Sequence, residues 1–147
     1  MSAALVLSLT AAMAITRSSA SMVVTATNVP YLRSTVAGEH AQVLVTEDDI
    51  RAGYVDVAGP EVGIRTNDPR GYVVVFRLAA GPFDAVTVSG LSREVEAGPG
   101  GAFVTEPRTS IQTTLHLRYR LRFVQAATPG SYAVPVAVSI CRPNALK

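Results

Sequence analysis

Strict alternation of apolar and polar residues over positions 115–123 limits the possible fold more than any other feature of this sequence. The apolar positions are Leu115, Leu117, Tyr119, Leu121 and Phe123, and the polar positions between them are His116, Arg118, Arg120 and Arg122. Successive side chains of a β-strand point to opposite faces, so the pattern predicts a strand with one buried and one solvated face. Strands of this kind are typical of antiparallel sheets.

A second alternating segment follows a Thr-Pro-Gly-Ser turn, and its apolar residues are Tyr132, Val134, Val136, Val138 and Ile140. We expect the larger residues of both segments to be buried. Further strand patterns cover 22–30, 41–46, 54–66 (broken in two at Gly59-Pro60), 72–79 and 83–98 (with a bend at Gly90). Turn composition marks 67–71, and 98–103 is expected to be a loop. Thr46 and Asp49 predict one capped helical turn. The pattern predicts an all-β, immunoglobulin-like antiparallel sandwich.

Composition is consistent with one packed domain after the N-terminal segment. Of 147 residues, 48% are hydrophobic and 16% are charged, with a net charge of +2. This balance disfavours disorder. No basic run or RNA-binding motif is present, so nucleic acid is not an expected partner.

The N-terminal segment 1–20 is predicted to be a secretion signal. An apolar stretch from Ala3 to Ile15 precedes small residues at Ser18 and Ala20, and the stretch is too short to span a membrane as a helix. Cleavage is expected after Ala20, with Ala14 as the alternative. The other interpretation of the stretch is a buried N-terminal helix. We expect export, and a single domain over 21–147.

The sequence carries no catalytic or metal-binding motif. His40 and His116 lack the spacing of metal ligands, and Glu47, Asp48 and Asp49 are consecutive rather than at the alternate positions of a calcium loop. We therefore expect no enzyme activity, no cofactor and no small-molecule substrate. Cys141 is the only cysteine, which excludes an intrachain disulfide. It is either incidental or a thiol that pairs with another chain.

The arginine stripe formed by Arg118, Arg120 and Arg122 has two interpretations. It is either a site for an acidic partner or a solvated sheet face whose arginine stems cover apolar surface.

The stretch "TPGSY" is similar to the tyrosine corner of immunoglobulin-like sandwiches, in which a Tyr near the start of strand F bonds back to the backbone. Tyr132 would be that residue, and 132–140 would be strand F. The residues after it, "CRPNALK", are a poor strand G. The domain would then lack its last strand and carry an open hydrophobic edge. The alternative is a complete sandwich in which Pro135 marks an exposed edge strand.

Three segments resemble the archaic chaperone–usher pilins related to spore coat protein U. They are "VVTATNVP" (23–30), "VDVAGPEVGIRTNDPRGYVVVF" (55–76) and "YRLRFVQAATPGSYAVPVAVSI" (119–140). The resemblance implies a structural subunit that reaches the cell surface or an extracellular fibre. A periplasmic chaperone and an outer-membrane usher would be its partners, together with like subunits.

The resemblance also implies site residues. Met22, Val24 and Ala26 would be donor-strand residues that enter a groove on the next subunit, and Tyr132, Val134, Val136, Val138 and Ile140 would line the groove or its edge. Two features depart from the family pattern. Asn28 stands where an apolar residue is expected, and the family's disulfide between the first two strands is missing. The alternative function is a complete extracytoplasmic domain that binds a surface partner or carbohydrate without polymerising.

Overall fold

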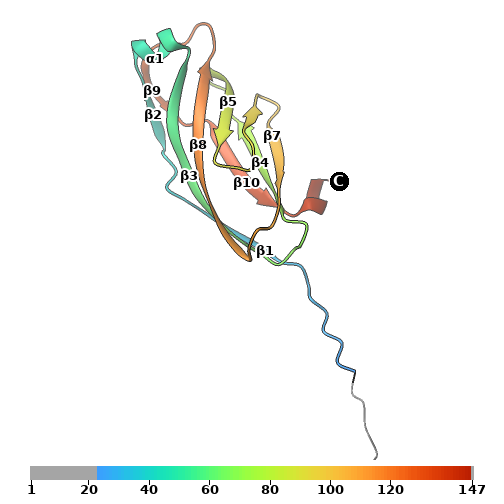
Figure 1. Ribbon diagram of the computed structural model, residues 1–147. Coiled ribbons are helices and arrows are strands. Elements are labelled where there is room, and N and C mark those ends of the chain that lie inside the picture. The colour runs from blue at the N-terminus through green and yellow to red at the C-terminus, as the bar shows by residue number, and fades with distance from the viewer. Residues whose placement is uncertain (1–22, 147) are drawn as a thin grey trace, which may run out of the picture.

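The computed structural model describes residues 23–146, and over this range the chain forms two facing layers of antiparallel β-sheet (Figure 1). The prediction of an all-β sandwich is confirmed. The signal predicted for 1–20 and the donor residue Met22 lie outside the described residues. The predicted turn at 67–71 is present, with the Gly71 amide bonded to the Asp68 carbonyl at 3.1 Å.

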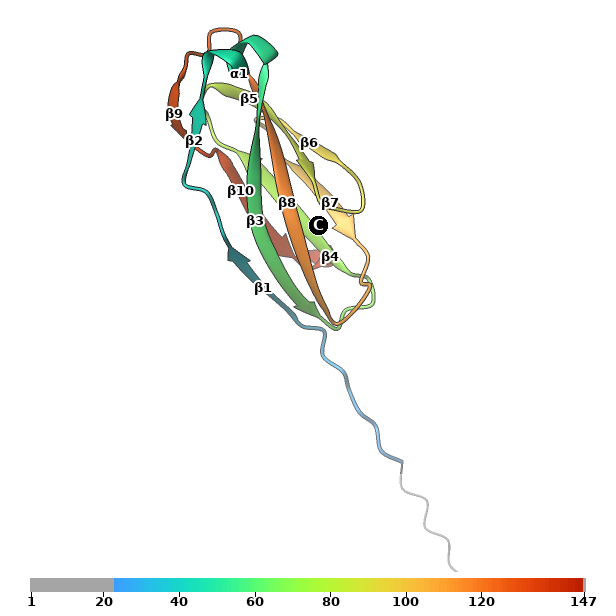
Figure 2. The same cartoon turned by 60° about the vertical axis from the view of Figure 1, so that its left-hand side comes forward.

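The larger layer is a five-stranded sheet in the order β1-β3-β8-β5-β6 (Figure 2). Its strands are β1 (Leu32–Ala37), β3 (Tyr54–Thr66), β8 (Gln112–Phe123), β5 (Phe83–Ser89) and β6 (Val95–Ala97). The segment with the strictest alternation, β8, lies at the centre of this sheet. Its odd-numbered residues face the second layer and its arginines face solvent.

The smaller layer consists of the order β10-β4-β7 and a short pair, β2-β9. Its strands are β2 (Gln42–Val45), β4 (Tyr72–Leu78), β7 (Ala102–Glu106), β9 (Gly130–Ala133) and β10 (Val136–Cys141). The helix α1 (Glu47–Ala52) caps one end of the sandwich, and a 3-10 helix (Pro143–Leu146) follows β10. Thr46 caps α1 as predicted, because its side chain accepts from the Asp49 amide and Asp49 bonds back to Thr46.

The core lies between the two layers. The larger layer contributes Val62, Ile64, Val86, Val88, Leu117, Tyr119 and Leu121, and the smaller layer contributes Val43, Val45, Tyr72, Val74, Phe76, Leu78 and Val104. Burial of Leu117, Tyr119 and Leu121 was expected and is confirmed. Val134, Val136 and Val138 were also expected to be buried, but they are only half-buried. Val136 and Val138 line the flank of the smaller layer where a neighbouring strand is missing from the described chain, and Val134 lies at the end of that flank.

The segment 54–66 is one strand rather than two. Its register against β8 shifts between Ala58 and Glu61, so Gly59-Pro60 forms a bulge instead of a break. The extra residue moves the inward positions from odd numbers (Val55, Val57) to even numbers (Val62, Ile64), while β8 keeps its odd phase. A side chain at position 59 would meet the Leu117 backbone at 2.9 Å, so only glycine fits there.

Three other expectations are corrected by the structure, and one strand was not foreseen. The segment 132–140 is two strands, β9 and β10, and their partners change at Val134-Pro135. Residues 23–30 form no strand, although 22–30 was predicted to be one. Residues 102–103 begin β7, whereas 98–103 was expected to be a loop, and β1 was not predicted at all. The predicted tyrosine corner does form, since the Tyr132 hydroxyl donates to the Thr128 carbonyl at 2.6 Å.

Candidate functional site

One flank of β10 has no neighbouring strand within the described chain. The other flank pairs with β4, with Val136 opposite Leu78 and Ile140 opposite Val74. The Ala79 amide donates to the Pro135 carbonyl at 2.7 Å, which fixes the phase of this antiparallel ladder. Backbone groups alternate between the two flanks. Residues 137, 139 and 141 therefore bond to β4, and the N–H and C=O groups of Val136, Val138 and Ile140 face the open flank.

The same flank is filled farther back along the chain. Strand β2 pairs with β9, and the Val134 amide donates to the Ala41 carbonyl at 3.2 Å. Even-numbered residues from 130 to 140 thus direct their backbone groups to one side. Strand β2 satisfies the first part of this row, and the part beside β10 is left without a strand.

The interior faces of the strands around this position are incompletely covered. Val136, Val138 and Ile140 are half-buried and contact the core. In β1, Ser34 and Val36 pair with Ile64 and Val62, so all four side chains share the inward face. Val36 nevertheless keeps 40% of its surface exposed. Inward-facing apolar side chains are exposed here because nothing in the described chain packs over them.

A hollow of about 240 Å³ marks one end of this position. It is lined by Glu39, His40, Ala41, Ala58, Pro60, Tyr119, Val134 and Val136. The start of β10 lies opposite β3 here, because Val136 lines the hollow together with Ala58 and Pro60. Strand β1 is next to β3 in the larger sheet, so the vacant place beside β10 lies opposite β1. We call the uncovered flank of β10, with the facing residues Leu32, Ser34 and Val36 of β1, the open edge. We call the hollow where it meets the β1–β2 crossing at 38–41 the end hollow.

Residues 23–30 leave the sandwich as an extended tail at the end opposite α1 (Figures 1 and 2). All eight are exposed, and Val23 and Val24 expose 85% and 75% of their surface. Ala26 is likewise exposed. Val24 and Ala26 therefore lie outside the sandwich, away from the open edge of their own chain.

Asn67 anchors the start of the tail. Its side-chain oxygen accepts from the Tyr31 amide at 2.7 Å, and its side-chain nitrogen donates to Asn28 Oδ1 at 2.6 Å and to the Val29 carbonyl at 3.1 Å. These bonds hold the point at which the tail leaves the domain. They act at its base only, since residues 23–27 have no hydrogen-bond partner among the described residues.

Asp68, in the same turn, is buried and bound to Arg70. Its carboxylate accepts from the Arg70 amide and from Nε and Nη2 of the guanidinium at 2.8–3.0 Å. These bonds to the Arg70 side chain and amide lower the pKa of Asp68 to about 2. Arg70 also donates to Asn144 Oδ1 at 2.8 Å, which links the turn to the 3-10 helix.

We expect this turn to give the domain an acid-sensitive contribution to stability. The folded-state pKa is depressed, so the contribution is complete above the unfolded pKa near 4 and is lost as the pH falls from about 4 through about 2. Asp68→Asn should lower the melting temperature at pH 7 and flatten its decline between pH 5 and pH 2. Asp48→Asn on exposed α1 is the control. Parallel acid profiles for Asp68→Asn and wild type would contradict the assignment.

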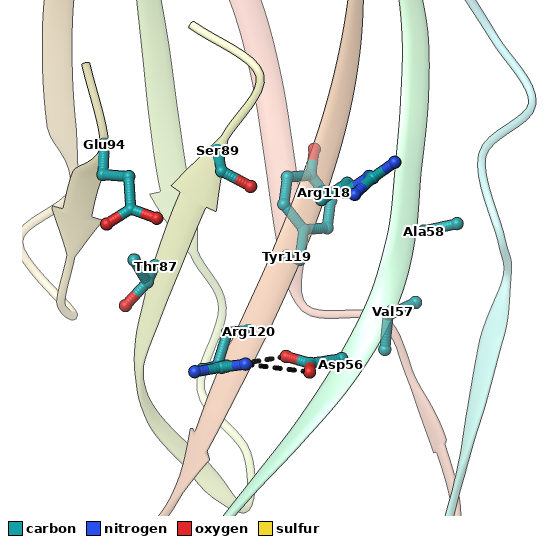
Figure 3. A pocket seen from close by; sticks show the side chains of 9 residues that line it. All are labelled: Asp56, Val57, Ala58, Thr87, Ser89, Glu94, Arg118, Tyr119 and Arg120. Atoms are coloured by element: carbon teal, nitrogen blue, oxygen red, sulfur yellow. Dashed lines mark hydrogen bonds and ion pairs between the residues drawn. The ribbon is translucent and has the colours of Figure 1, made fainter.

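The arginine stripe lies on the outer face of the larger sheet, where Figure 3 shows Arg120 bound to Asp56 and Arg118 farther along the same strand. Arg120 binds Asp56 through two bonds of 2.7 and 3.0 Å and lies 4.2 Å over the Tyr54 ring. Arg122 pairs with Asp84 and Glu96. These charges are neutralised by neighbouring strands, an arrangement that matches the solvated-face interpretation. Arg118 lines a shallow hollow of about 550 Å³ and has no ion pair among residues 23–146.

The remaining candidate groups are carried by different elements of the described chain. No group of three or more His, Cys, Asp or Glu side chains there could hold a metal ion. His116 lies 3.6 Å from Glu61 on the exposed face. Cys141 is a free, half-buried thiol at the end of β10.

The structure brings Val134, Val136, Val138 and Ile140 together along one flank, with Tyr132 displaced onto β9. Sequence reasoning missed β1 and the crossing at 38–41, which form the facing side of the open edge. A weak signal for β1 was available, because Leu32, Ser34 and Val36 stand at alternate positions. Ser34 at the middle position interrupts the apolar pattern and makes the signal weak.

No helix within residues 23–146 has the length and apolar character needed to cross a membrane. The chain matches no family model, no curated protein and no solved structure.

Proposed function

We propose that this protein is a secreted, pilin-like structural subunit that assembles by strand addition. The open edge receives the N-terminal segment 22–29 of another copy of the chain. Met22, Val24 and Ala26 of the incoming segment are the residues that cover the half-buried face of β10. The topology we propose is an immunoglobulin-like sandwich that lacks one strand, with the incoming segment in the vacant place. A periplasmic chaperone and an outer-membrane usher are the proposed partners during export and assembly.

The observation that carries this proposal is the phase of β10. Its core-facing side chains and its unpaired backbone groups belong to the same three residues, Val136, Val138 and Ile140. A strand added here gains main-chain hydrogen bonds and covers apolar side chains at once, which is the physical basis of β-strand addition. An open edge of this kind invites pairing with another chain.

The tail has the matching chemistry. Residues 23–28 supply a short β-branched segment of about the same length as the open part of β10, and it is free of charge. Each copy therefore has one exposed tail and one open edge at different places on its surface. A contact between two different surfaces is heterologous, and when repeated without closure it produces a filament.

Filling the edge with the chain's own tail is disfavoured by geometry. The tail joins β1 at the end of the sandwich where β10 finishes, so a tail folded back in cis would run parallel to β10. A tail from another copy is free to run antiparallel, which is the commoner and slightly more stable pairing. The alternative function is a non-polymerising binding domain. It requires the open edge to remain unpaired or to be filled in cis.

The experiment is a binding measurement with a synthetic peptide of residues 22–29. The acceptor is the chain carrying Val24→Asp, whose own tail is a poor competitor. Binding should raise the melting temperature of the acceptor in proportion to the logarithm of peptide concentration. At 100-fold excess over Kd the gain is about 2.7 kcal/mol by mass action.

A peptide of identical composition in scrambled order is the control. It keeps the hydrophobicity but loses the alternation, and it should neither bind nor stabilise. Equal binding of both peptides, or binding of neither, would contradict strand addition. If deletion of 21–29 instead unfolds an isolated monomer, the segment belongs to its own sandwich, and the non-polymerising domain becomes the better account.

A further inference from the structure

Tyr119 carries a buried hydroxyl with no hydrogen-bond partner among the described residues. The residue is 3% exposed on the inward face of β8, and its oxygen is the one buried side-chain polar atom of residues 23–146 left unpaired. Leaving such a group unpaired costs stability, so each instance in a folded domain calls for an explanation. Burial, followed by the negative charge of Glu39, raises the pKa of Tyr119 and keeps its proton in place.

The end hollow brings this hydroxyl near a free acceptor. Tyr119 and Glu39 both line it, among mainly small or apolar neighbours. Glu39 is exposed and forms no ion pair or hydrogen bond within the described chain. A group that accepts a hydrogen bond from Tyr119 and donates one to Glu39 would satisfy both. A side-chain amide has this combination of donor and acceptor.

The tail carries one such amide on its groove-facing side. In a strand, Val24, Ala26 and Asn28 point to the same face. If the strand runs antiparallel to β10, its C-terminal end lies at Val136, beside the end hollow. The register that pairs Val24 with Ile140 and Ala26 with Val138 places Asn28 opposite Val136. Asn28, which stands where an apolar residue is expected, then lies beside the polar groups of Tyr119 and Glu39 at this end of the open edge.

We propose that Asn28 of a second copy of the chain enters the end hollow and fixes the register of the incoming strand. The Tyr119 hydroxyl donates to Asn28 Oδ1, and Asn28 Nδ2 donates to the Glu39 carboxylate. This inference rests on the proposed function and specifies its register. A slip of two residues would place the amide against Val138 or leave Tyr119 unpaired. A single buried polar residue is known to select register in this way.

The base of the tail stays attached to its own domain when Asn28 enters the end hollow of another copy. In the free chain Asn28 Oδ1 accepts from Asn67 Nδ2, and this bond must break on insertion. Asn67 keeps its bonds to the Val29 carbonyl and the Tyr31 amide. One exposed hydrogen bond is thus replaced by two in the end hollow.

A double-mutant cycle tests the pairing. Peptides of residues 22–29 with Asn28 or with Asn28→Ala are titrated against two acceptors, both carrying Val24→Asp and one also carrying Tyr119→Phe. On the Tyr119 acceptor, Asn28→Ala should weaken Kd by about tenfold, the value of one to two hydrogen bonds. On the Tyr119→Phe acceptor the loss should fall to about threefold, because the bond from Asn28 to Glu39 remains when the hydroxyl is removed.

The outcomes separate this inference from the function on which it rests. Equal losses on both acceptors would overturn the Asn28 pairing and leave strand addition standing. Failure of both peptides to bind either acceptor would overturn both proposals. If Tyr119→Phe disturbs folding, Glu39→Ala at the exposed crossing takes its place in the cycle, and the loss from Asn28→Ala should shrink there too.

Discussion

Replacing Val24 with aspartate is expected to abolish self-assembly of this chain and to leave its own domain folded. Val24 is exposed on the free tail, so the domain loses no contact. On assembly the same side chain would enter another copy's open edge, where an unpaired charge costs several kcal/mol. Sedimentation velocity of the purified chain should show a shift from large species to monomer, with an unchanged melting temperature for the monomeric domain.

Val23→Asp is the matched control, because it adds the same charge one residue away. In a strand, Val23 points to the opposite face from Val24 and would stay in solvent. Its assemblies should therefore persist. If the two variants assemble equally well, or if both lose assembly to the same extent, the face assigned to Val24 is wrong.

Truncation of Leu121 is expected to cause the largest loss of stability among single substitutions in the central strand. Leu121 has no exposed surface and lies within the contiguous core between the two layers. Removing its side chain beyond Cβ leaves a cavity, which typically costs about 2–5 kcal/mol. Denaturant unfolding of Leu121→Ala should show a lower midpoint with an unchanged slope.

Leu44→Ala is the comparison for that measurement. Leu44 is on β2 and exposes most of its surface, so the same chemical change should alter the free energy of unfolding by about 0.5 kcal/mol or less. Similar losses for the two variants would mean that the odd-numbered face of β8 is not the buried one.

Sequence reasoning succeeded where one face of a strand is buried and the other is wet. Residues 115–123 were assigned to the correct face because apolar and polar residues alternate there without exception. The Thr46 cap and the Tyr132 corner were found for a related reason. Each depends on hydrogen bonds between residues three or four apart in the chain.

It failed where a strand's pattern contradicts its environment. In β7, Phe103 faces solvent and Glu106 is buried, with its carboxylate accepting from the Ser92 amide and hydroxyl. Val104 between them is buried, as an apolar residue should be, but residues 102–103 were placed in the loop predicted for 98–103 and residues 104–106 were given no assignment. The break between β9 and β10 was missed for a different reason. The alternation keeps its phase through Pro135, and only the partner strand changes, from β2 to β4.

Of the two sides of the open edge, only the β10 side was predicted. Val136, Val138 and Ile140 were identified from their alternation, but the facing residues of β1 depend on pairing with β3, some thirty residues away in sequence. Long-range pairing of this kind leaves little trace in a short weakly apolar segment. For the same reason the end hollow, which joins β3, β8 and β10, could not have been anticipated.

Amide hydrogen exchange along β10 tests the central claim most directly. The measurement uses the chain carrying Val24→Asp, with and without the peptide of residues 22–29. The amides of Ala137, Ser139 and Cys141 bond to β4 and should be protected in both samples. Strand addition predicts that the amides of Val136, Val138 and Ile140 exchange rapidly alone and become protected when the peptide is present. Unchanged exchange at these three amides, at peptide concentrations that saturate any binding, would contradict it.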